Sequence, residues 1–237
     1  DYTNFGLNRK FRATPLYSFG GKWDAHKETF LKNINWLNNL SLRATYGVNG
    51  NISTTLYPFT WISVSPSDFV TQQPSASIIA PANPELRWEK TYVSNFALDF
   101  GLFKNRLTGS IDYFNKTTKD LLFPQIAFSP AVGGNVPTWV NLPGQIINKG
   151  LELTLNGIII DQDNLTWSLG GNATFISNKV QDINGIIKTG SLNGQGLSGV
   201  TTEVIQNGLP LFAMVTRQYN GLDASGFSKY TDDGFTA

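Results

Sequence analysis

The stretch that decides the fold is residues 100–122, which read FGLFKNRLTGSIDYFNKTTKDLL. On both sides of the dipeptide Lys104-Asn105, apolar residues recur at every second position, which is the period of a β-strand with one apolar face. Behind the dipeptide the apolar residues of this pattern are Leu107, Ile111 and Tyr113. The stretch therefore predicts two antiparallel strands joined by a short turn.

The same alternation recurs along the rest of the chain. The stretches that show it are 11–23, 40–48, 89–103, 106–116, 148–156 and 165–175. The first is weaker, because Pro15 and Gly20-Gly21 interrupt it. Several stretches reach about 10 residues, the length at which a tilted strand crosses a bilayer, whereas strands average about 5–6 residues. The best helical candidate is 29–39, which is short and rich in Asn.

Composition excludes several functional classes. Lys and Arg number 18 and Asp and Glu 17, so no basic face for nucleic acid is expected. There is no cysteine, which excludes disulfides and thiolate metal sites. Charged residues are 15% and aromatic residues 13% of the chain, which favours an all-β protein that is not fully surrounded by water. No apolar run is long enough for a membrane-spanning helix, and no signal peptide opens the chain.

Alternating strands also build soluble sandwiches, so further features are needed to choose. Aromatic residues gather near strand ends: Tyr46, Tyr92 and Tyr113, with Trp88 beyond, at one end, and Phe100, Phe103 and Trp167 at the other. Short connections alternate with long ones at 49–86, 117–147 and from 178 onward, although 24–39 is longer than a turn. Aromatic girdles and such alternation are typical of outer-membrane barrels. The fold class expected is all-β, with antiparallel strands of a transmembrane outer-membrane β-barrel and long extracellular loops.

The face opposite the apolar stripes is polar and mixed in charge. The residues predicted to face the lumen are Arg43, Asp99, Arg106, Asp112 and Glu152. Asp112 and Glu152 could act as paired carboxylates only if they were close in space. Ion pairs with Arg43 or Arg106, or contacts with water, are the favoured alternative.

Specific strings then resemble a known family. They are TYGVNGN at 45–51, NPELRWEKT at 83–91, the hairpin at 100–122, NKGLELTLN at 148–156, and GLP at 208–210 with YNGL at 219–222. Their order and spacing resemble SusC/RagA-type TonB-dependent outer-membrane transporters, over residues 11–222. Leu211 and Phe212 depart from the family's small residues at the last string, which puts the local turn in doubt.

The resemblance implies a function and partners. Family members are large plugged barrels in the outer membrane of Bacteroidetes-like bacteria. A SusD-like surface lipoprotein caps them, and TonB drives them through an N-terminal segment. The chain is then expected to be an internal fragment that forms part of the barrel, imports oligosaccharides or peptides, does no catalysis and needs no cofactor. A soluble carbohydrate-binding β-domain is the alternative. The expected organisation is barrel strands with loops at 1–177 and an extracellular loop region at 178–237, with the plug domain absent from the chain.

Few other residues suggest a site. Tyr57, Trp61 and Trp139 lie in the expected loops and are candidates for substrate or partner contact, although packing of the loops on each other is favoured. His26, the single histidine, is expected to be a solvated loop residue, because metal sites and charge relays need a constellation. Calcium at Asp223, Asp232 and Asp233 lacks the full ligand pattern. The glycine-rich string 194–199 lies outside any βαβ unit and is discarded.

Overall fold

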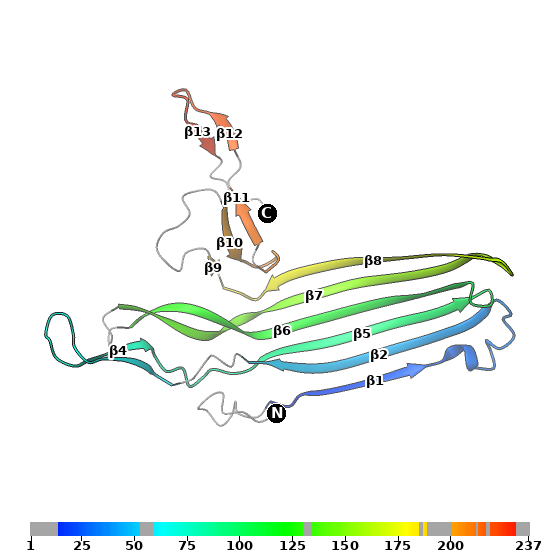
Figure 1. Cartoon of the computed structure of the whole chain (residues 1–237), viewed down its shortest axis with the longest axis horizontal. Helices are drawn as coiled ribbons and strands as arrows, with labels where there is room; N and C mark the ends of the chain where they lie inside the picture. The colour runs from blue at the N-terminus through cyan, green and yellow to red at the C-terminus, as the bar shows by residue number, and fades with distance from the viewer. Residues whose placement is uncertain are drawn as a thin grey trace.

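The computed structural model describes residues 14–52, 59–129, 134–184, 187–188, 201–211, 213–216 and 219–230. Its main unit is a six-stranded antiparallel sheet in which neighbours in sequence pair, apart from a detour between the second and third strands (Figure 1). The strands are β1 (Tyr17–Trp23), β2 (Leu37–Asn51), β5 (Glu89–Leu102), β6 (Leu107–Ser129), β7 (Gly134–Gln162) and β8 (Leu165–Gln181). Each contains one of the alternating stretches or most of it, so the six predicted strands are confirmed. The sheet does not close into a barrel by itself.

Small elements lie in the connections. They are a 3-10 turn η1 (Ala25–Lys27) and the strands β3 (Trp61–Ser65), β4 (Ser75–Ala80), β9 (Ile187–Lys188), β10 (Thr201–Ile205), β11 (Ala213–Thr216), β12 (Tyr219–Leu222) and β13 (Ser228–Tyr230). Among the described residues, no helix has the length and apolar character to cross a membrane.

The helical prediction for 29–39 is wrong. Residues 29–33 form turns, and β2 already begins at Leu37. The reason is tertiary, because Leu37 pairs with Leu102 of β5 and the Asn38 side chain accepts a hydrogen bond from the Lys104 amide. Pairing with the next strand overrides the weak local helical preference.

The two faces of the sheet differ along its middle. One cross-strand row contains Leu42, Leu98, Ile111, Leu153 and Ala173, and the next row, on the opposite face, contains Arg43, Ala97, Asp112, Glu152 and Thr174. We name these the apolar face and the polar face. Phe96, Leu169 and Phe175 on the apolar face are 56%, 64% and 63% exposed. No second layer of described residues covers the middle of the sheet (Figure 1).

The apolar face has the height of a membrane band. Along β8 its apolar residues run from Leu165 to Phe175. At about 3.4 Å per residue and a tilt of about 40°, this stretch spans roughly 26 Å. Outer-membrane barrels carry an apolar band of about 25 Å. The stripe is therefore long enough to face the hydrocarbon of a bilayer.

The connections differ at the two ends of the sheet. At the turn end, tight turns join β5 to β6 and β7 to β8, and Phe103, Lys104 and Asn105 all have positive φ. The opposite end, which we name the loop end, carries the long connections. The long connection predicted at 49–86 is confirmed between β2 and β5, and the connection at 24–36 is longer than a turn, as expected. The prediction for 117–147 is wrong, because this stretch is not a loop. β6 and β7 continue as paired strands to Ser129 and Gly134.

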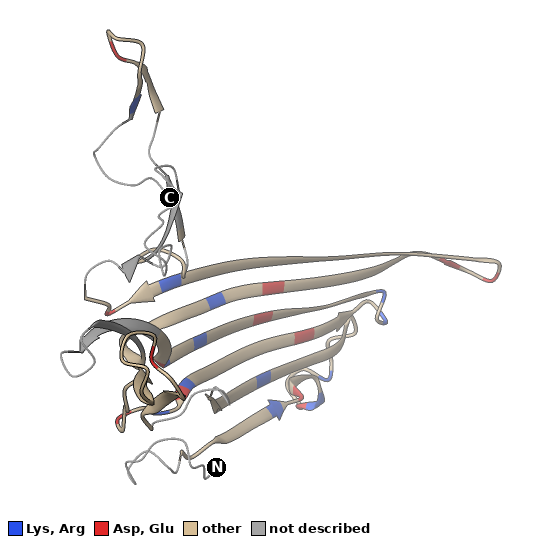
Figure 2. Ribbon diagram, turned by 60° about the vertical axis from the view of Figure 1, so that its left-hand side comes forward, with Lys and Arg blue, Asp and Glu red and all other residues tan. Residues whose placement is uncertain are grey.

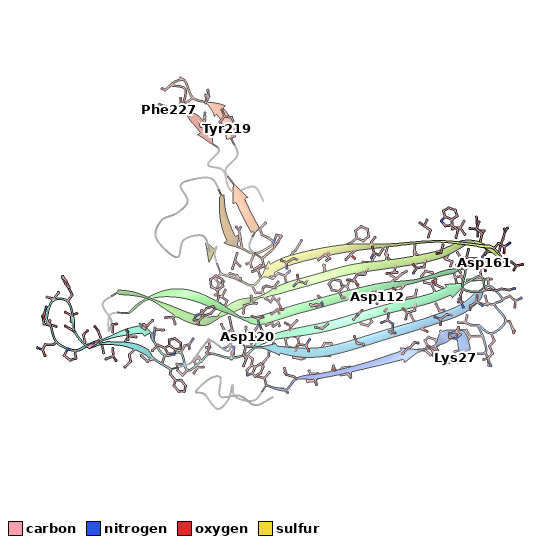
Figure 3. All side chains as sticks on the ribbon, in the orientation of Figure 1. Lys27, Asp112, Asp120, Asp161, Tyr219 and Phe227 are labelled. Carbon is pink, nitrogen blue, oxygen red and sulfur yellow. The ribbon has the colours of Figure 1, made fainter. Side chains whose placement is uncertain are left out.

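One register shift separates the six-stranded sheet from this extended hairpin. Lys119 pairs with Gln145 and Leu121 with Leu142, so Asp120 lies opposite Pro143 and Gly144. Asp120 has φ 58° and Gly144 has φ 136°. Such bulges bend a strand pair and increase its twist. Asp120 accordingly marks the place where the hairpin leaves the sheet (Figure 3).

The buried core lies at the loop end. Val180, Ile205, Ile183 and Ile146 are at most 5% exposed and form its main cluster. The Gly208-Leu209-Pro210 string lies along the edge of β8, where the Gly208 amide donates to Val180 O and the Val180 amide to Leu209 O, both at 2.8 Å. The Asn207 side chain accepts a hydrogen bond from the Ile183 amide and donates one to the Ile183 carbonyl. The 208–210 string thus binds the edge of β8 at the loop end.

The aromatic positions are partly as expected. Tyr17, Phe19 and Tyr46 form a ring cluster with centroids 5.5–6.5 Å apart toward the loop end. Trp36 and Phe103 make a tilted ring contact at the turn end, with centroids 6.4 Å apart. Tyr113 is a correction, because it pairs with Phe96 and Leu151 within the apolar band and not beside Tyr92.

Asp24, in the connection after β1, provides the first testable prediction. Hydrogen bonds from Lys27, Ser41 and Lys22 hold the pKa of its carboxyl far below the ordinary value. Because the folded-state pKa is depressed, the stabilisation is complete above about pH 4, the unfolded value, and declines as the pH falls toward the folded-state pKa. We expect Lys27→Gln to raise the titration midpoint of Asp24 in a carbon-13 NMR titration, and Lys32→Gln to leave it unchanged. A midpoint in the ordinary range in the unmodified protein would contradict the assignment.

Candidate functional site

The most structured group on the polar face is an ion cluster centred on Arg43. Its guanidinium donates to both carboxylate oxygens of Asp99, at 2.7 and 3.0 Å, and to Asp112 at 3.2 Å. The cluster joins β2, β5 and β6, and Asp112 lies along the middle of the sheet (Figure 3). A bidentate arginine pair is directional and holds both side chains in one geometry. The cluster links three neighbouring strands through charged side chains on the polar face.

The other two predicted residues of this face lie outside the cluster. Glu152 is the register partner of Asp112 and is exposed, and within the described residues its carboxylate has no ion pair. Arg106 lies in the turn after β5, and its guanidinium donates to the carbonyl of Ile159 at 3.3 Å. The expected ion pair with Arg43 is therefore confirmed for Asp112, whereas no carboxylate of the described residues pairs with Arg106. In Figure 2, acidic and basic positions lie on neighbouring strands of the sheet.

A second organised region fastens the 83–88 segment to the base of the β6–β7 hairpin. Arg87 binds the Asp120 carboxylate at 2.7 Å. The Asn141 side chain accepts from the Arg87 amide and donates to the carbonyls of Arg87 and Asp120, at 2.7–2.9 Å. Leu86 beside them is only 1% exposed and packs against Ile52 and Leu122. The connection before β5 is thus fixed in place at the loop end.

Removing the Asn141 side chain should release this segment. Asn141→Ala deletes three hydrogen bonds to backbone groups, and we expect a local loss of about 1–2 kcal/mol. The readout is hydrogen exchange of the Arg87 amide, which should become about tenfold faster. Asn156→Ala on the same strand is the matched control. Equal protection of Arg87 in both variants would show that Asn141 does not hold the segment.

The candidate contact aromatics are only partly described. Tyr57 lies outside the described residues. Trp61 begins β3 and is 46% exposed, and Trp139 of β7 is 37% exposed. The Asn83 side chain donates to the Trp139 carbonyl at 2.7 Å. Trp139 therefore belongs to the fastened segment, while Trp61 lies in the β3–β4 hairpin.

Of the remaining candidates, His26 and Asp223 contact backbone groups. His26 lies in the connection after β1 and is partly exposed, and its Nδ1 lies 3.3 Å from the Leu40 carbonyl. Asp223 accepts from the amides of Ser225 and Phe227 and closes the turn before β13. Asp232, Asp233 and the string 194–199 lie outside the described residues. Across the residues that are described, no three histidine or acidic side chains gather as metal ligands.

The apolar face is hollowed across β1, β2, β5 and β6. A depression of about 580 Å³ lies there, lined largely by Trp23, Leu42, Ala44, Phe96, Leu98 and Tyr113. Lys22 and Arg43 also line the depression, but most of its lining is apolar.

Sequence reasoning missed two groups of residues. Asn141 and Asp120 fell in a presumed loop, and only the pairing of β6 with β7 reveals their role. Four lysines, Lys90, Lys119, Lys149 and Lys179, fall on the apolar face by register. Strand parity within the predicted stretches 89–103 and 148–156 would have found Lys90 and Lys149, and parity extended past residues 116 and 175 would have found Lys119 and Lys179.

Comparison with known proteins places the chain among receptors and transporters. A family model described as "TonB dependent receptor-like, beta-barrel" matches residues 1–235. TonB-dependent receptor P3 of Formosa agariphila is 34% identical over 183 residues, which cover 75% of this chain and 18% of the relative. TonB-dependent receptor SusC of Bacteroides thetaiotaomicron is 29% identical over 199 residues, which cover 77% of this chain and 18% of the relative.

Solved structures agree with these relatives. The RagAB peptide transporter superposes with a TM-score of 0.72 at 26% identity, covering 96% of this chain and 25% of that chain. The RagAB peptide importer in its open-open state gives a TM-score of 0.73 at 25% identity, covering 98% of this chain and 26% of that chain. The chain thus spans about a fifth of the length of these curated relatives and about a quarter of the solved chains.

Proposed function

Because the chain belongs to the TonB-dependent receptor β-barrel family, we propose that it forms part of the wall of an outer-membrane transporter that imports nutrients such as oligosaccharides or peptides. The chain is an outer-membrane protein, as its SusC and RagA relatives are. The observation that carries the proposal is the sheet itself, with an exposed apolar band on one face and the Arg43 ion cluster on the other. In lipid, such strands satisfy their backbone groups only within a closed barrel.

We assign the proposed roles to parts of the chain as follows. Residues 1–177 supply barrel strands with their loops, and 178–237 supply an extracellular loop region. Arg43, Asp99, Arg106, Asp112 and Glu152 face the water or plug within the pore. Tyr57, Trp61 and Trp139 contact substrate or partner at the mouth. These assignments rest on strand register and on the position of the loop end.

The proposed partners are those that the family resemblance implies. A SusD-like lipoprotein would cap the mouth at the loop end, and TonB would act through a plug domain carried elsewhere in the protein. The likeness to the RagAB peptide transporter favours peptide cargo, and oligosaccharides are the other class that the resemblance implies. The wall does no covalent chemistry in this proposal.

The alternative of a soluble carbohydrate-binding domain lacks support. It requires the apolar faces to pack against each other, yet Phe96, Leu169 and Phe175 are all more than half exposed. No comparison points to a soluble lectin. The transporter is therefore the function that the observations favour.

Labelling of single cysteines tests which face meets water. The segment has no cysteine, so Glu152→Cys and Leu153→Cys can be introduced into the whole protein after any other cysteines are replaced. In cells, a charged maleimide should label residue 152 and not residue 153. Equal labelling of both, or a protein that stays soluble without detergent, would contradict the barrel assignment.

Uptake tests the transport itself. A strain that lacks the gene should lose accumulation of one class of labelled substrate, peptides or oligosaccharides. Restoring the gene should recover accumulation of that class. Removal of TonB should abolish that recovery. Unchanged uptake of both classes would refute import while leaving the barrel assignment intact.

A further inference from the structure

Four lysines occupy the apolar face near the loop end. Lys90 of β5 and Lys119 of β6 are direct register partners, in a row with Gly50 and Gln145. Lys149 of β7 pairs with Asn115 and Ser177, and Lys179 of β8 pairs with Ile147. Lys119, Lys149 and Lys179 are exposed and Lys90 is half-buried. Figure 2 shows basic positions on neighbouring strands of the sheet toward the loop end. We name Lys90, Lys119, Lys149 and Lys179 the lysine quartet.

No carboxylate neutralises the quartet on its own face. Within the described part of the chain, the five ion pairs use other lysines and arginines. From the row of Tyr46, Ser94 and Lys149 to the loop end, the apolar-face positions contain no Asp or Glu. Asp120 and Asp182 line one depression with Lys119. Asp120 is paired with Arg87, whereas Asp182 accepts a hydrogen bond from the neutral Gln145 amide and keeps its negative charge. The four lysines therefore keep a net positive charge beside this one carboxylate.

The arrangement opposes the stability of the isolated sheet. Like charges directly across an antiparallel pair are destabilising, and Lys90 and Lys119 are such a pair. Lys149 and Lys179 are diagonal neighbours, about 7–8 Å apart at their backbones. The ring of Tyr92 lies 5.8 Å from the Lys119 ammonium and offsets only part of one charge. An anion bound between the lysines would remove the repulsion.

The depth of the quartet indicates what kind of anion can reach it. On β5 and β6, the last full apolar row is that of Phe96 and Tyr113, and the quartet lies beyond it, toward the loop end. This outward face is the lipid-facing face of the proposed barrel, so the remaining barrel strands do not cover it. The groups found at this depth are the head groups of the leaflet on the loop side, above chains that reach the depression at Phe96 and Tyr113. A basic patch at such an interface attracts phosphate.

We propose that the lysine quartet binds the phosphate groups of a phosphorylated lipid in the leaflet on the loop side. The proposal rests on the proposed function, because the apolar face must contact the membrane. Lys90 with Lys119 and Lys149 with Lys179 form two positions at which a phosphate is held by a pair of ammonium groups. The acyl chains of the same lipid lie against the apolar rows below.

The test uses the whole protein, purified in detergent and exposed to lipid A or to dephosphorylated lipid A. Retained lipid is measured by native mass spectrometry. The variants are K90Q/K119Q and K149Q/K179Q, and the charge-matched control is K32Q/K104Q, two exposed lysines in the turn-end connections. We expect each quartet variant to weaken lipid A binding by about tenfold or more, and the control to leave it unchanged.

Each outcome decides. Preference for lipid A over its dephosphorylated form, lost in the quartet variants alone, supports the proposal. Equal binding of both lipids, or equal loss in the control, overturns it. Reduced co-purification of a lipoprotein with lipid A binding intact would assign the lysines to a protein partner and overturn it as well. Heat-modifiable migration and substrate uptake are measured in parallel. If the unmodified protein shows neither heat-modifiable migration nor substrate uptake, the proposed function fails. If they persist in every variant while lipid A binding never changes, only the lipid site fails.

Discussion

Ile111→Arg should destabilise the protein by about 2–4 kcal/mol, the cost of an arginine facing lipid near the bilayer midplane. Ile111 lies in the central row of the apolar face, between Leu98 and Leu153, and is 37% exposed. Its neighbours in that row offer no carboxylate to pair with the new charge. The loss should appear as a lower urea midpoint for the whole protein folded into lipid vesicles.

The matched control is Ser110→Arg, one residue away on the polar face. Ser110 pairs with Asp99 and Thr154, so the new guanidinium would meet water and a carboxylate. We expect a change within about 0.5 kcal/mol, as for ordinary surface substitutions. If both arginines destabilised equally, the face with Ile111 would not contact lipid, and the barrel interpretation would fail.

Gly144→Ala should cost about 2–4 kcal/mol, through backbone strain and overpacking together. Gly144 has φ 136°, a backbone conformation that residues with a side chain rarely adopt. A Cβ at this position would lie 2.5 Å from Cγ1 of Ile183 and 3.0 Å from the carbonyl oxygen of Gln181. The neighbouring backbone therefore limits how far the strand can shift to relieve the overlap.

The loss should concentrate where the β6–β7 hairpin leaves the wall. We expect faster hydrogen exchange around Asp120 and Asn141 as well as a lower urea midpoint. Gly171→Ala on β8 is the control, because a Cβ there would meet no atom within 4 Å. Wild-type stability in Gly144→Ala would mean that the bulge tolerates a side chain, and that its geometry does not depend on glycine.

The wall itself follows from the sequence. Two apolar stripes each predicted a strand and which of its side chains lie on the apolar face. They are Leu107, Ile111 and Tyr113, and Leu151, Leu153 and Leu155. The structure confirms both, because alternation is a local property of an extended chain and needs no knowledge of the partner strand. The short turn at Lys104-Asn105 was predictable for the same reason.

The loop end was less predictable. Residues 117–147 contain Gly, Pro and Asn, which weaken strand signals, so the paired continuation of β6 and β7 was mistaken for a loop. The strand pairing depends on each partner supplying the other's hydrogen bonds across many residues. The helical prediction at 29–39 failed likewise, since pairing with β5 recruited Leu37 and Asn38 into β2.

By itself, the sequence determined that six amphipathic strands form and which side of each is apolar, because side-chain direction repeats every two residues. Only the tertiary structure decided which residues meet across strands. Arg43 reaches Asp99 and Asp112, Asn141 fastens Arg87, and Lys90 faces Lys119 because of the register between strands. Register is a long-range choice, fixed when complete strands align and their bulges fall into place.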